Sequence, residues 1–320
     1  MSRVFPLVLI FLISFMPISE VRADQHSSQK AVLVTGASTG LGRSMTEMMA
    51  ANGYFVYAGA RKDKDMAELN AIENVQAVRL DVNKQDQIDA AVVTIRDAGR
   101  DLYGLVNNAG VVVFGALIEI EEEDFDFQMD VNIDGVYRVT RAFAPLIIES
   151  KGRISIISSI SGTLSSATWG PYSMTKHAME AYGDALADEM KRFDVQVSLI
   201  EPGTYTSKIG QSAVSRMEQR EQGTGSSQYK AEMDETVNWL TTALADSGDP
   251  AEVSKAVMHA LFDDNPLPRY MVVPNEEQAQ WTIYRAIERV VEKNKWQAYS
   301  YDRAALIEML DKALAAQAGE

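Results

Sequence analysis

A tyrosine and a lysine four residues apart have the clearest potential for chemistry in this sequence. They are Tyr172 and Lys176, and on a helix they would lie on the same face. A free tyrosine keeps its proton to about pH 10, and a nearby cation favours the phenolate. The pair is therefore suited to move a proton. Taken singly, Tyr172 is more often a packing residue and Lys176 a solvated helix lysine.

A turn with three glycines near the N-terminal end could hold phosphates. It runs TGASTGLG from Thr35 to Gly42, between an apolar run rich in β-branched residues and a stretch with helical spacing. A helix N-terminus there offers unpaired backbone N–H groups and a positive dipole to a pyrophosphate. Gly36 would make the tight turn, Gly40 would let the backbone approach the phosphates, and Gly42 would allow close helix packing. A mere tight turn is the alternative, although this position favours a nucleotide.

The end of the second predicted strand indicates which nucleotide binds. A site for NAD usually has an acidic residue there for the ribose 2′-hydroxyl, whereas a 2′-phosphate requires a cation. The stretch ends in Gly59-Ala60-Arg61-Lys62, and the next acidic residue is Asp63. Because the guanidinium of Arg61 suits a phosphate, we expect NADP in preference to NAD. The alternative is that Arg61 is a solvated loop residue.

Several short motifs occur together in one order along the chain. They are the glycine turn, NNAG at 107–110, IISSISG with Ser159 thirteen residues before Tyr172, and YSMTK ending at Lys176. Their order and spacing resemble those of the short-chain dehydrogenase/reductase family, over roughly residues 30–273. The resemblance extends to Asp81-Val82, to Asn132 in DVNIDG, and to Pro202-Gly203 with Thr206.

The resemblance implies a catalytic set of Asn132, Ser159, Tyr172 and Lys176. Tyr172 would be the acid/base, its pKa lowered by Lys176 together with the positive nicotinamide ring. Lys176 would also hold the nicotinamide ribose, and Ser159 would polarise a substrate carbonyl or hold an alcohol beside Tyr172. Asn132, at a distortion in a long helix, would hold a water that links Lys176 to solvent.

The resemblance also implies which residues bind the cofactor. Asp81 would accept a hydrogen bond from the adenine amino group, and Val82 would touch that ring. Thr206 would meet the carboxamide, with Thr204 as a competitor for that role. The full expected set is Gly36, Ser38, Thr39, Gly40, Leu41, Gly42, Arg61, Asp81, Val82, Asn108, Ala109, Gly110, Tyr172, Lys176, Pro202, Gly203 and Thr206.

Short apolar runs alternate with helix-length segments along the chain, and together they must position these residues. The alternation predicts a parallel sheet, and right-handed crossovers would place helices on both faces. We therefore expect an α/β Rossmann fold, a doubly wound parallel sheet with its ligand site at the carboxyl ends of the strands. The predicted strands are residues 31–35, 54–58, 75–79, 104–106, 153–157, 195–200 and 269–273.

Two later segments depart from the minimal family pattern. Residues 204–229 are polar and predict a mobile connection that is neither a strand nor a buried helix, but a lid or a solvated loop. Helical spacing returns at 231–245 and 250–262. Residues 30–274 would form the Rossmann-fold domain, and 275–320 a helical extension with amphipathic helices at 277–292 and 303–316. The extension would cap the site or serve an interface.

Composition excludes several classes of function. The chain has no cysteine and three histidines, which excludes disulfides and thiolate catalysis and leaves little for a histidine metal cluster. Its formal charge of −15 disfavours binding to nucleic acid phosphates. We therefore expect neither a bound metal nor a nucleic acid partner.

The first residues predict a targeting segment. An uncharged, mostly apolar stretch at 4–18 follows Arg3 and is shorter than the roughly 20 apolar residues of a spanning helix. Small residues before position 24 suit a signal peptidase, so residues 1–23 are predicted to be a signal peptide, or alternatively an uncleaved membrane anchor. We expect export or membrane association, with a cytoplasmic protein as the alternative.

These observations favour an oxidoreductase that transfers a hydride between nicotinamide and a secondary alcohol or ketone. The alternatives are a non-catalytic dinucleotide-binding regulator of the same fold and a sugar-nucleotide epimerase. The resemblance implies a homodimer or homotetramer formed through the long helices that carry Asn132 and Tyr172. An apolar substrate is favoured by five residues that could equally be core: Val112, Val113, Phe114, Leu164 and Trp169.

Overall fold

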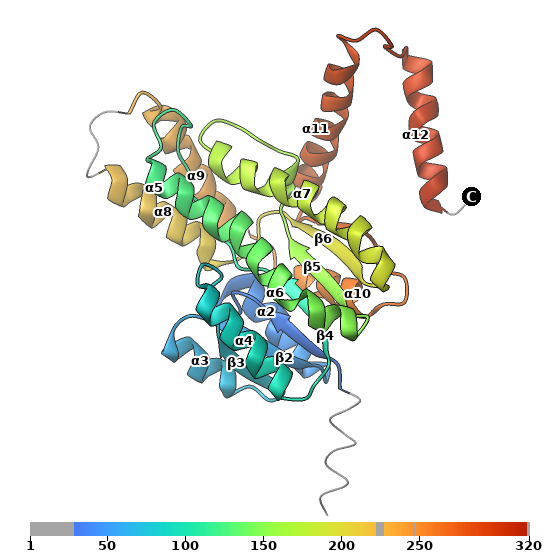
Figure 1. Ribbon diagram of the computed structural model, residues 1–320. Helices are drawn as coiled ribbons and strands as arrows, with labels where there is room; N and C mark the ends of the chain where they lie inside the picture. Colours follow the sequence, from blue (N-terminus) through green and yellow to red (C-terminus); the bar gives the residue numbers. More distant parts are fainter. Residues whose placement is uncertain (1–28, 222–226, 246, 319–320) are drawn as a thin grey trace, which may run out of the picture.

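The computed structural model describes residues 29–221, 227–245 and 247–318 (Figure 1). The predicted signal peptide or anchor at residues 1–23 lies outside the described residues. Within the described ranges, no helix combines the length and the apolar character needed to cross a membrane.

Seven parallel strands form one sheet in the order β3-β2-β1-β4-β5-β6-β7. The chain moves outward from β1 to β3, returns to the other side of β1 at β4, and then continues to β7. This reversal of strand order confirms the predicted doubly wound Rossmann fold and opens a crevice between β1 and β4. The strands are β1 (Ala31–Val34), β2 (Phe55–Ala60), β3 (Val75–Arg79), β4 (Leu102–Asn107), β5 (Arg153–Ile157), β6 (Gln196–Pro202) and β7 (Arg269–Val272).

Helices cover both faces of the sheet (Figure 1). Alternate residues of a strand enter different cores: Ala31 and Leu33 pack on the α4, α6 and α7 side, whereas Val32 and Val34 pack on the α2, α3 and α10 side. Burial on both faces explains why the strands are continuous apolar runs. These helices are α2 (Gly40–Ala51), α3 (Asp63–Asn70), α4 (Gln85–Asp97), α6 (Gly135–Glu149), α7 (Gly170–Met190) and α10 (Ala251–Phe262).

Short irregular helices interrupt or follow the regular elements. A π-helical turn, η1 (Asp130–Asp134), lies between α5 (Glu122–Met129) and α6 and contains Asn132. The distortion expected around this asparagine is therefore confirmed. Two 3-10 turns follow β5 and α7, at η2 (Ile160–Gly162) and η3 (Lys191–Phe193).

The prediction of a mobile connection at 204–229, neither a strand nor a buried helix, is wrong for residues 208–221, and residues 222–226 lie outside the described residues. Residues Lys208–Glu221 form helix α8, and α9 (Lys230–Ala245) follows. Ala213 and Met217, one turn apart, are buried against Leu240 of α9 and Phe114. The apolar face of α8 is narrow, so the polar composition of the segment concealed its helical spacing.

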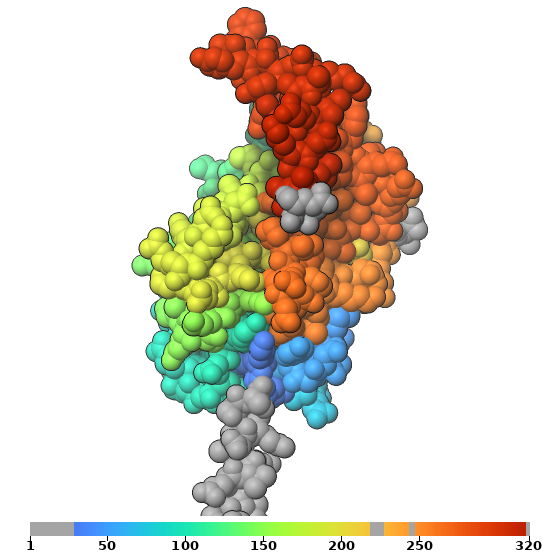
Figure 2. Space-filling model, turned by 90° about the vertical axis from the view of Figure 1, so that its right-hand side faces the viewer, coloured from blue at the N-terminus to red at the C-terminus, as the bar shows by residue number. Residues whose placement is uncertain are grey.

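The C-terminal extension consists of two helices, as predicted. They are α11 (Glu276–Asn294) and α12 (Arg303–Ala318). Figure 1 shows them projecting from the body as a hairpin, and the extension rises above the rest of the surface in Figure 2. Residues of α11 from Gln278 to Glu288 supply part of one wall of the cavity described next.

Candidate active site

A cavity of about 1440 Å³ runs along the carboxyl ends of the strands. Its walls come from the turn after β1, the ends of β2 to β6, the start of α7, and parts of α8, α9 and α11. Ordinary ligand pockets occupy roughly 300–1,000 Å³. The larger volume suits a cofactor and a substrate lying side by side.

The glycine turn forms one end of this cavity. Gly36 and Gly40 have φ angles of +65° and +55°, which favour glycine over any side chain. A methyl group on Gly42 would overlap the carbonyl oxygen of Gly36, so α2 could not begin so close to β1. Thr39, the N-cap of α2, makes no side-chain cap hydrogen bond, and Ser38 and Leu41 join it on the wall. The first N–H groups of α2 are thus suited to bind phosphate.

The NNAG motif ties β4 to β1 at the edge of the cavity. The hydroxyl oxygen of Thr35 accepts hydrogen bonds from the backbone N–H groups of Asn108 and Ala109, at 2.9 and 3.0 Å. The side-chain amide of Asn108 donates to the carbonyl of Thr35 at 2.8 Å. Gly110 follows on the wall and packs near the side-chain oxygen of Asn132. These hydrogen bonds hold in place the backbone at this edge of the cavity, along which a dinucleotide would lie.

Arg61 and Asp81 meet at the far end of the cavity, after β2 and β3. Their closest charged atoms, Nη1 and Oδ2, are 4.0 Å apart, and 61% of the Arg61 side chain is exposed. Asp81 also accepts a hydrogen bond from the backbone N–H of Asn83 at 3.1 Å. Val82 is buried beside them on the cavity wall. The sequence did not reveal this ion pair, because it depends on the adjacency of β2 and β3.

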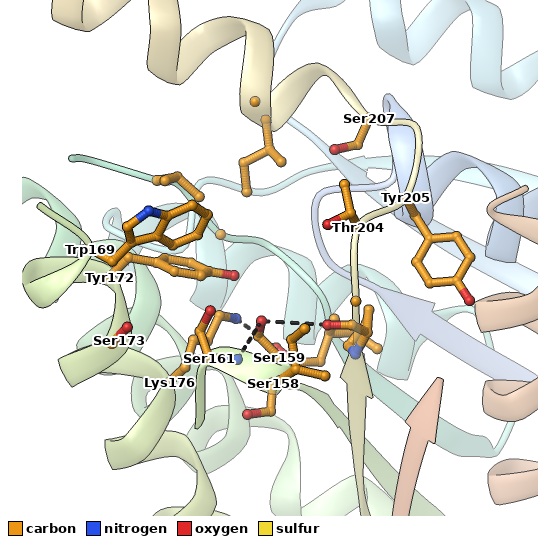
Figure 3. Close-up of a pocket in the computed structure, with 18 of the residues that line it drawn as sticks. Ser158, Ser159, Ser161, Trp169, Tyr172, Ser173, Lys176, Thr204, Tyr205 and Ser207 are labelled. Carbon is orange, nitrogen blue, oxygen red and sulfur yellow. Dashed lines mark hydrogen bonds between the residues drawn. The ribbon is translucent and has the colours of Figure 1, made fainter. Parts of the chain in front are cut away.

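Ser159, Tyr172 and Lys176 come together where β5 ends and α7 begins (Figure 3). The side chain of Ser159 lies close enough to the phenol of Tyr172 to lower its pKa. The Ser159 hydroxyl oxygen accepts from the backbone N–H of Ser161 at 3.1 Å and lies 3.5 Å from the carbonyl oxygen of Pro202. The Nζ of Lys176 donates to the carbonyl of Ile157 at 2.9 Å and lies 5.6 Å from the centroid of the Tyr172 ring.

Burial controls the protonation of this group. It raises the pKa of Tyr172 to about 12, against the opposing effect of the hydrogen bond from Ser159. Burial also lowers the pKa of Lys176 to about 8, which the nearby carboxylate of Glu180 opposes. The expected lowering of the Tyr172 pKa is therefore not produced by the chain alone, since desolvation outweighs the opposing effect of Ser159. The phenol keeps its proton through the neutral range.

Asn132 is held by the protein on both sides of its amide. Its oxygen accepts from the backbone N–H of Val111 at 2.8 Å. Its nitrogen donates to the carbonyl of Val111 at 2.9 Å and to the hydroxyl of Thr175 at 3.1 Å. It thus joins the loop after β4 to the residue next to Lys176.

Thr206 lies outside the lining of the main cavity, and its expected contact with the cofactor carboxamide stays a prediction. The hydroxyl of Thr206 bonds to that of Ser247 at 2.6 Å, and the residue lies in a shallow recess outside the main cavity. Thr204, the competitor two positions earlier, stands on the cavity wall with Pro202 and Gly203. Spacing within this loop alone could not distinguish the two threonines.

Residues of α11 complete the wall, and sequence reasoning did not single them out. The side-chain oxygen of Gln278 accepts a hydrogen bond from the backbone N–H of Thr204 at 2.9 Å. Asn275 caps the start of α11 by accepting from the N–H of Gln278 at 3.0 Å. Farther along, Arg289 is hydrogen-bonded to the ring of His177 at 2.8 Å. The amphipathic spacing predicted the helix, but nothing in it indicated where the helix docks.

An aromatic cluster lines the part of the cavity beyond Tyr172. The ring of Trp169 makes edge contacts with those of Phe114, Trp239 and Tyr172, at centroid distances of 4.6, 5.1 and 6.4 Å. Val112 and Leu164 also lie on the wall, whereas Val113 is buried outside it, as the core alternative proposed.

Comparison with known proteins establishes the family. Residues 30–218 match the family model described as short chain dehydrogenase. The chain belongs to the short-chain dehydrogenase family. This dehydrogenase is 33% identical over 286 residues to the mitochondrial D-beta-hydroxybutyrate dehydrogenase of Bos taurus, covering 82% of this chain and 83% of the relative.

Further similarities agree with this membership. Retinol dehydrogenase 7 of Mus musculus is 31% identical over 264 residues, which cover 78% of this chain and 83% of the relative. The crystal structure of a short-chain dehydrogenase from Streptomyces avermitilis superimposes with a TM-score of 0.72 and 29% identity, over 84% of this chain and 96% of that one. The dehydrogenase is thus an NAD(P)-dependent oxidoreductase that acts on CH–OH groups.

Proposed function

We propose that this dehydrogenase uses NADP and interconverts a secondary alcohol and a ketone that carries a bulky, uncharged apolar group. The observation that carries the proposal is the Tyr172 phenol, which lies with Ser159 on the cavity wall beside the aromatic cluster of Phe114, Trp169 and Trp239. A substrate oxygen at the two hydroxyls would place its substituent against these rings.

The side chains divide the reaction between them. In the reduction direction, the protonated Tyr172 donates its proton to the carbonyl oxygen while Ser159 holds that oxygen in place. The bound cofactor supplies the redox chemistry, as a hydride donor in its reduced form and a hydride acceptor in its oxidised form. The ammonium of Lys176 would hold the nicotinamide ribose and favour the phenolate that remains. Asn132, bonded to the residue beside Lys176, would hold the water that returns protons from solvent.

The proposed preference for NADP is supported by the end of β2. Ala60 stands where an acid would bind the ribose of NAD, and the exposed Arg61 side chain lies at that end of the cavity. A 2′-phosphate would offer Arg61 charge-assisted bonds that the 4.0 Å contact with Asp81 does not. Asp81 would then remain available for the adenine amino group.

The proposed neutral substrate is supported by the charges on the cavity wall. Four cationic side chains occur there among the residues that the structure describes. Arg61 lies at the adenine end, and Arg285 is paired with Glu288 and Glu292. Lys176 is buried and bonded, and the backbone of Lys208 lies near Gly40 in the phosphate half. None is placed among the aromatic rings to receive a substrate carboxylate.

Turnover of two ketones by purified protein tests the proposal. With NADPH, we expect a phenyl alkyl ketone to be reduced much faster than acetoacetate, which carries a carboxylate. Tyr172→Phe should lose about a hundredfold or more of the rate while binding NADP normally. Faster turnover of acetoacetate would contradict the substrate class. NADP binding without turnover of any alcohol or ketone would favour the regulator.

We further propose that the protein forms an oligomer and that it is exported or associated with a membrane. A homodimer or homotetramer would be recognised by light scattering at micromolar concentration. Export or membrane association through residues 1–23 would be recognised by fractionation with amino-terminal sequencing of the mature protein.

A further inference from the structure

A half-buried carboxylate follows the lysine of the active site on the same helix. Glu180 follows Lys176 by one helical turn and Tyr172 by two, so the three share one face of α7. The hydroxyl of Ser158 donates to Oε1 of Glu180, and the carbonyl of the preceding residue, Ile157, accepts from Lys176. Two successive residues at the end of β5 are therefore held by two successive turns of α7.

A single arginine from the last strand clamps this carboxylate. Arg269 of β7 donates to Oε2 of Glu180 through Nε at 3.0 Å and through Nη2 at 2.8 Å. The same guanidinium contacts Oε1 of Glu201 on β6 at 2.6 Å and Oδ1 of Asp184 on α7 at 3.1 Å. The Glu180 side chain is only 16% exposed, and a side chain at Gly162 would collide with it. The carboxylate thus has little freedom to move away from Lys176.

The charges in this cluster differ in their exposure. The side chain of Glu201 is 7% exposed and that of Asp184 is 66% exposed. Burial and the neighbouring Glu180 raise the pKa of Glu201 to about 7, and both carboxylates contact Arg269. Near neutral pH, Glu201 therefore takes up a proton, and Arg269 is left to balance Glu180 and the exposed Asp184.

We propose that Glu180 is a positioning residue for this reaction, whose clamped carboxylate keeps Lys176 charged and directed toward the nicotinamide ribose and Tyr172. The proposal rests on the role of Lys176 in the proposed function. Burial alone favours a neutral lysine, and Glu180 is the charge that opposes it. Without this carboxylate, the lysine would lose its proton at a lower pH.

Other groups around Lys176 do not supply the same charge. Tyr172 is the titratable neighbour on the preceding turn of α7, and Asp184 lies one turn beyond Glu180. From β7 comes Arg269, which is bonded to Glu180, and from β6 comes Glu201, which contacts the same guanidinium. The end of β5 and η2 add only serine hydroxyls and backbone carbonyls toward the cluster.

The test compares Glu180→Gln with Asp184→Asn as its matched control. Both remove one carboxylate from Arg269, but the control removes one that is exposed and farther from Lys176. NADP affinity is measured by calorimetry from about pH 6 to 10, and kcat is followed over the same range. In Glu180→Gln, the loss of affinity on the alkaline side should begin about one pH unit lower, whereas Asp184→Asn should match the wild type.

Two further variants separate charge from shape. Glu180→Asp keeps the carboxylate, so its NADP affinity at alkaline pH should be close to that of the wild type. In a Lys176→Met background, Glu180→Gln should no longer change the pH dependence of NADP binding. A uniform loss of affinity with an unchanged pH dependence, or a loss of affinity at alkaline pH in Glu180→Asp as large as that in Glu180→Gln, would overturn the proposal.

A measurement of stability tests the proposal independently if Glu180→Gln folds poorly in the wild-type background. In the Lys176→Met background, the same substitution should lower the urea midpoint less than in the wild type, because no buried ammonium then loses its neighbouring carboxylate. An equal fall of the urea midpoint in both backgrounds would overturn the proposed action of Glu180 on Lys176. Because affinity and stability are measured without turnover, these results do not depend on the substrate class.

Discussion

Replacing the active-site lysine should make the fold more stable while it abolishes function. Lys176 is 8% exposed, and its ammonium gives up a proton far more easily in the folded chain than in water. Lys176→Met keeps a similar unbranched stem and removes the buried charge. The variant should therefore unfold at a higher urea concentration near neutral pH.

The magnitude follows from the pKa. The fall from 10.5 to about 8, at about 1.36 kcal/mol for each pKa unit, corresponds to about 3 kcal/mol of strain in the folded state at pH 7. Against this, the carbonyl of Ile157 loses its 2.9 Å donor, which costs about 1–3 kcal/mol. The expected net stabilisation by Lys176→Met is about 1 kcal/mol.

The dependence on pH is the sharper test. Between about pH 8 and 10.5 the unfolded chain binds this proton more strongly than the folded chain, so the wild type gains stability as the pH rises through that window. Urea unfolding at about pH 7 and about pH 9.5 should show the advantage of Lys176→Met shrinking by roughly 2 kcal/mol and reversing sign. The matched control is Lys191→Met, because the Lys191 side chain is 74% exposed. An advantage of the same size at both pH values would refute the assignment of a buried, strained ammonium.

Three further predictions concern binding. Arg61→Ala should weaken the binding of NADP about ten- to a hundredfold and leave the binding of NAD nearly unchanged, with Lys62→Ala as the control. Equal losses of affinity for both cofactors in calorimetry would contradict the cofactor proposal. Gln278→Ala removes the acceptor for the Thr204 backbone and should weaken NADP binding several-fold, whereas Gln297→Ala, exposed and outside the cavity wall, should not. Trp239→Ala should raise KM for a phenyl alkyl ketone about tenfold with little change for acetone, and a similar effect on both ketones would argue against an aromatic subsite.

The sheet could be predicted from the sequence because its strands are buried on both faces. The predicted ranges 75–79 and 153–157 coincide with β3 and β5, and the others differ by at most two residues at an end. An apolar run bounded by turn residues is a local signal, so it survives without knowledge of the fold. The helices of the extension were predicted for the same reason.

What could not be predicted depends on contacts between distant segments. The helix α8 is stabilised by Ala213 and Met217 against α9, and its polar surroundings hid that narrow face. Gln278 reaches Thr204 only because α11 folds back over the end of β6.

The raised pKa of Tyr172 also depends on contacts between distant segments. Spacing placed Lys176 beside it, but spacing says nothing about burial, which raises the pKa to about 12. Burial is a property of the whole fold, so the sign of this shift could not be obtained from two residues on one helix.

The aromatic cluster gives the molecule an internal optical reporter. Of the four tryptophans in the chain, Trp169, Trp239 and Trp281 lie on the cavity wall. Trp296, in the connection between α11 and α12, is 97% exposed. The reduced nicotinamide ring absorbs in the range where tryptophan emits, so the three cavity indoles should transfer energy to it when NADPH binds, while Trp296 keeps a water-like emission. Cofactor entry can thus be followed in the unlabelled protein through the loss of emission from the three cavity indoles.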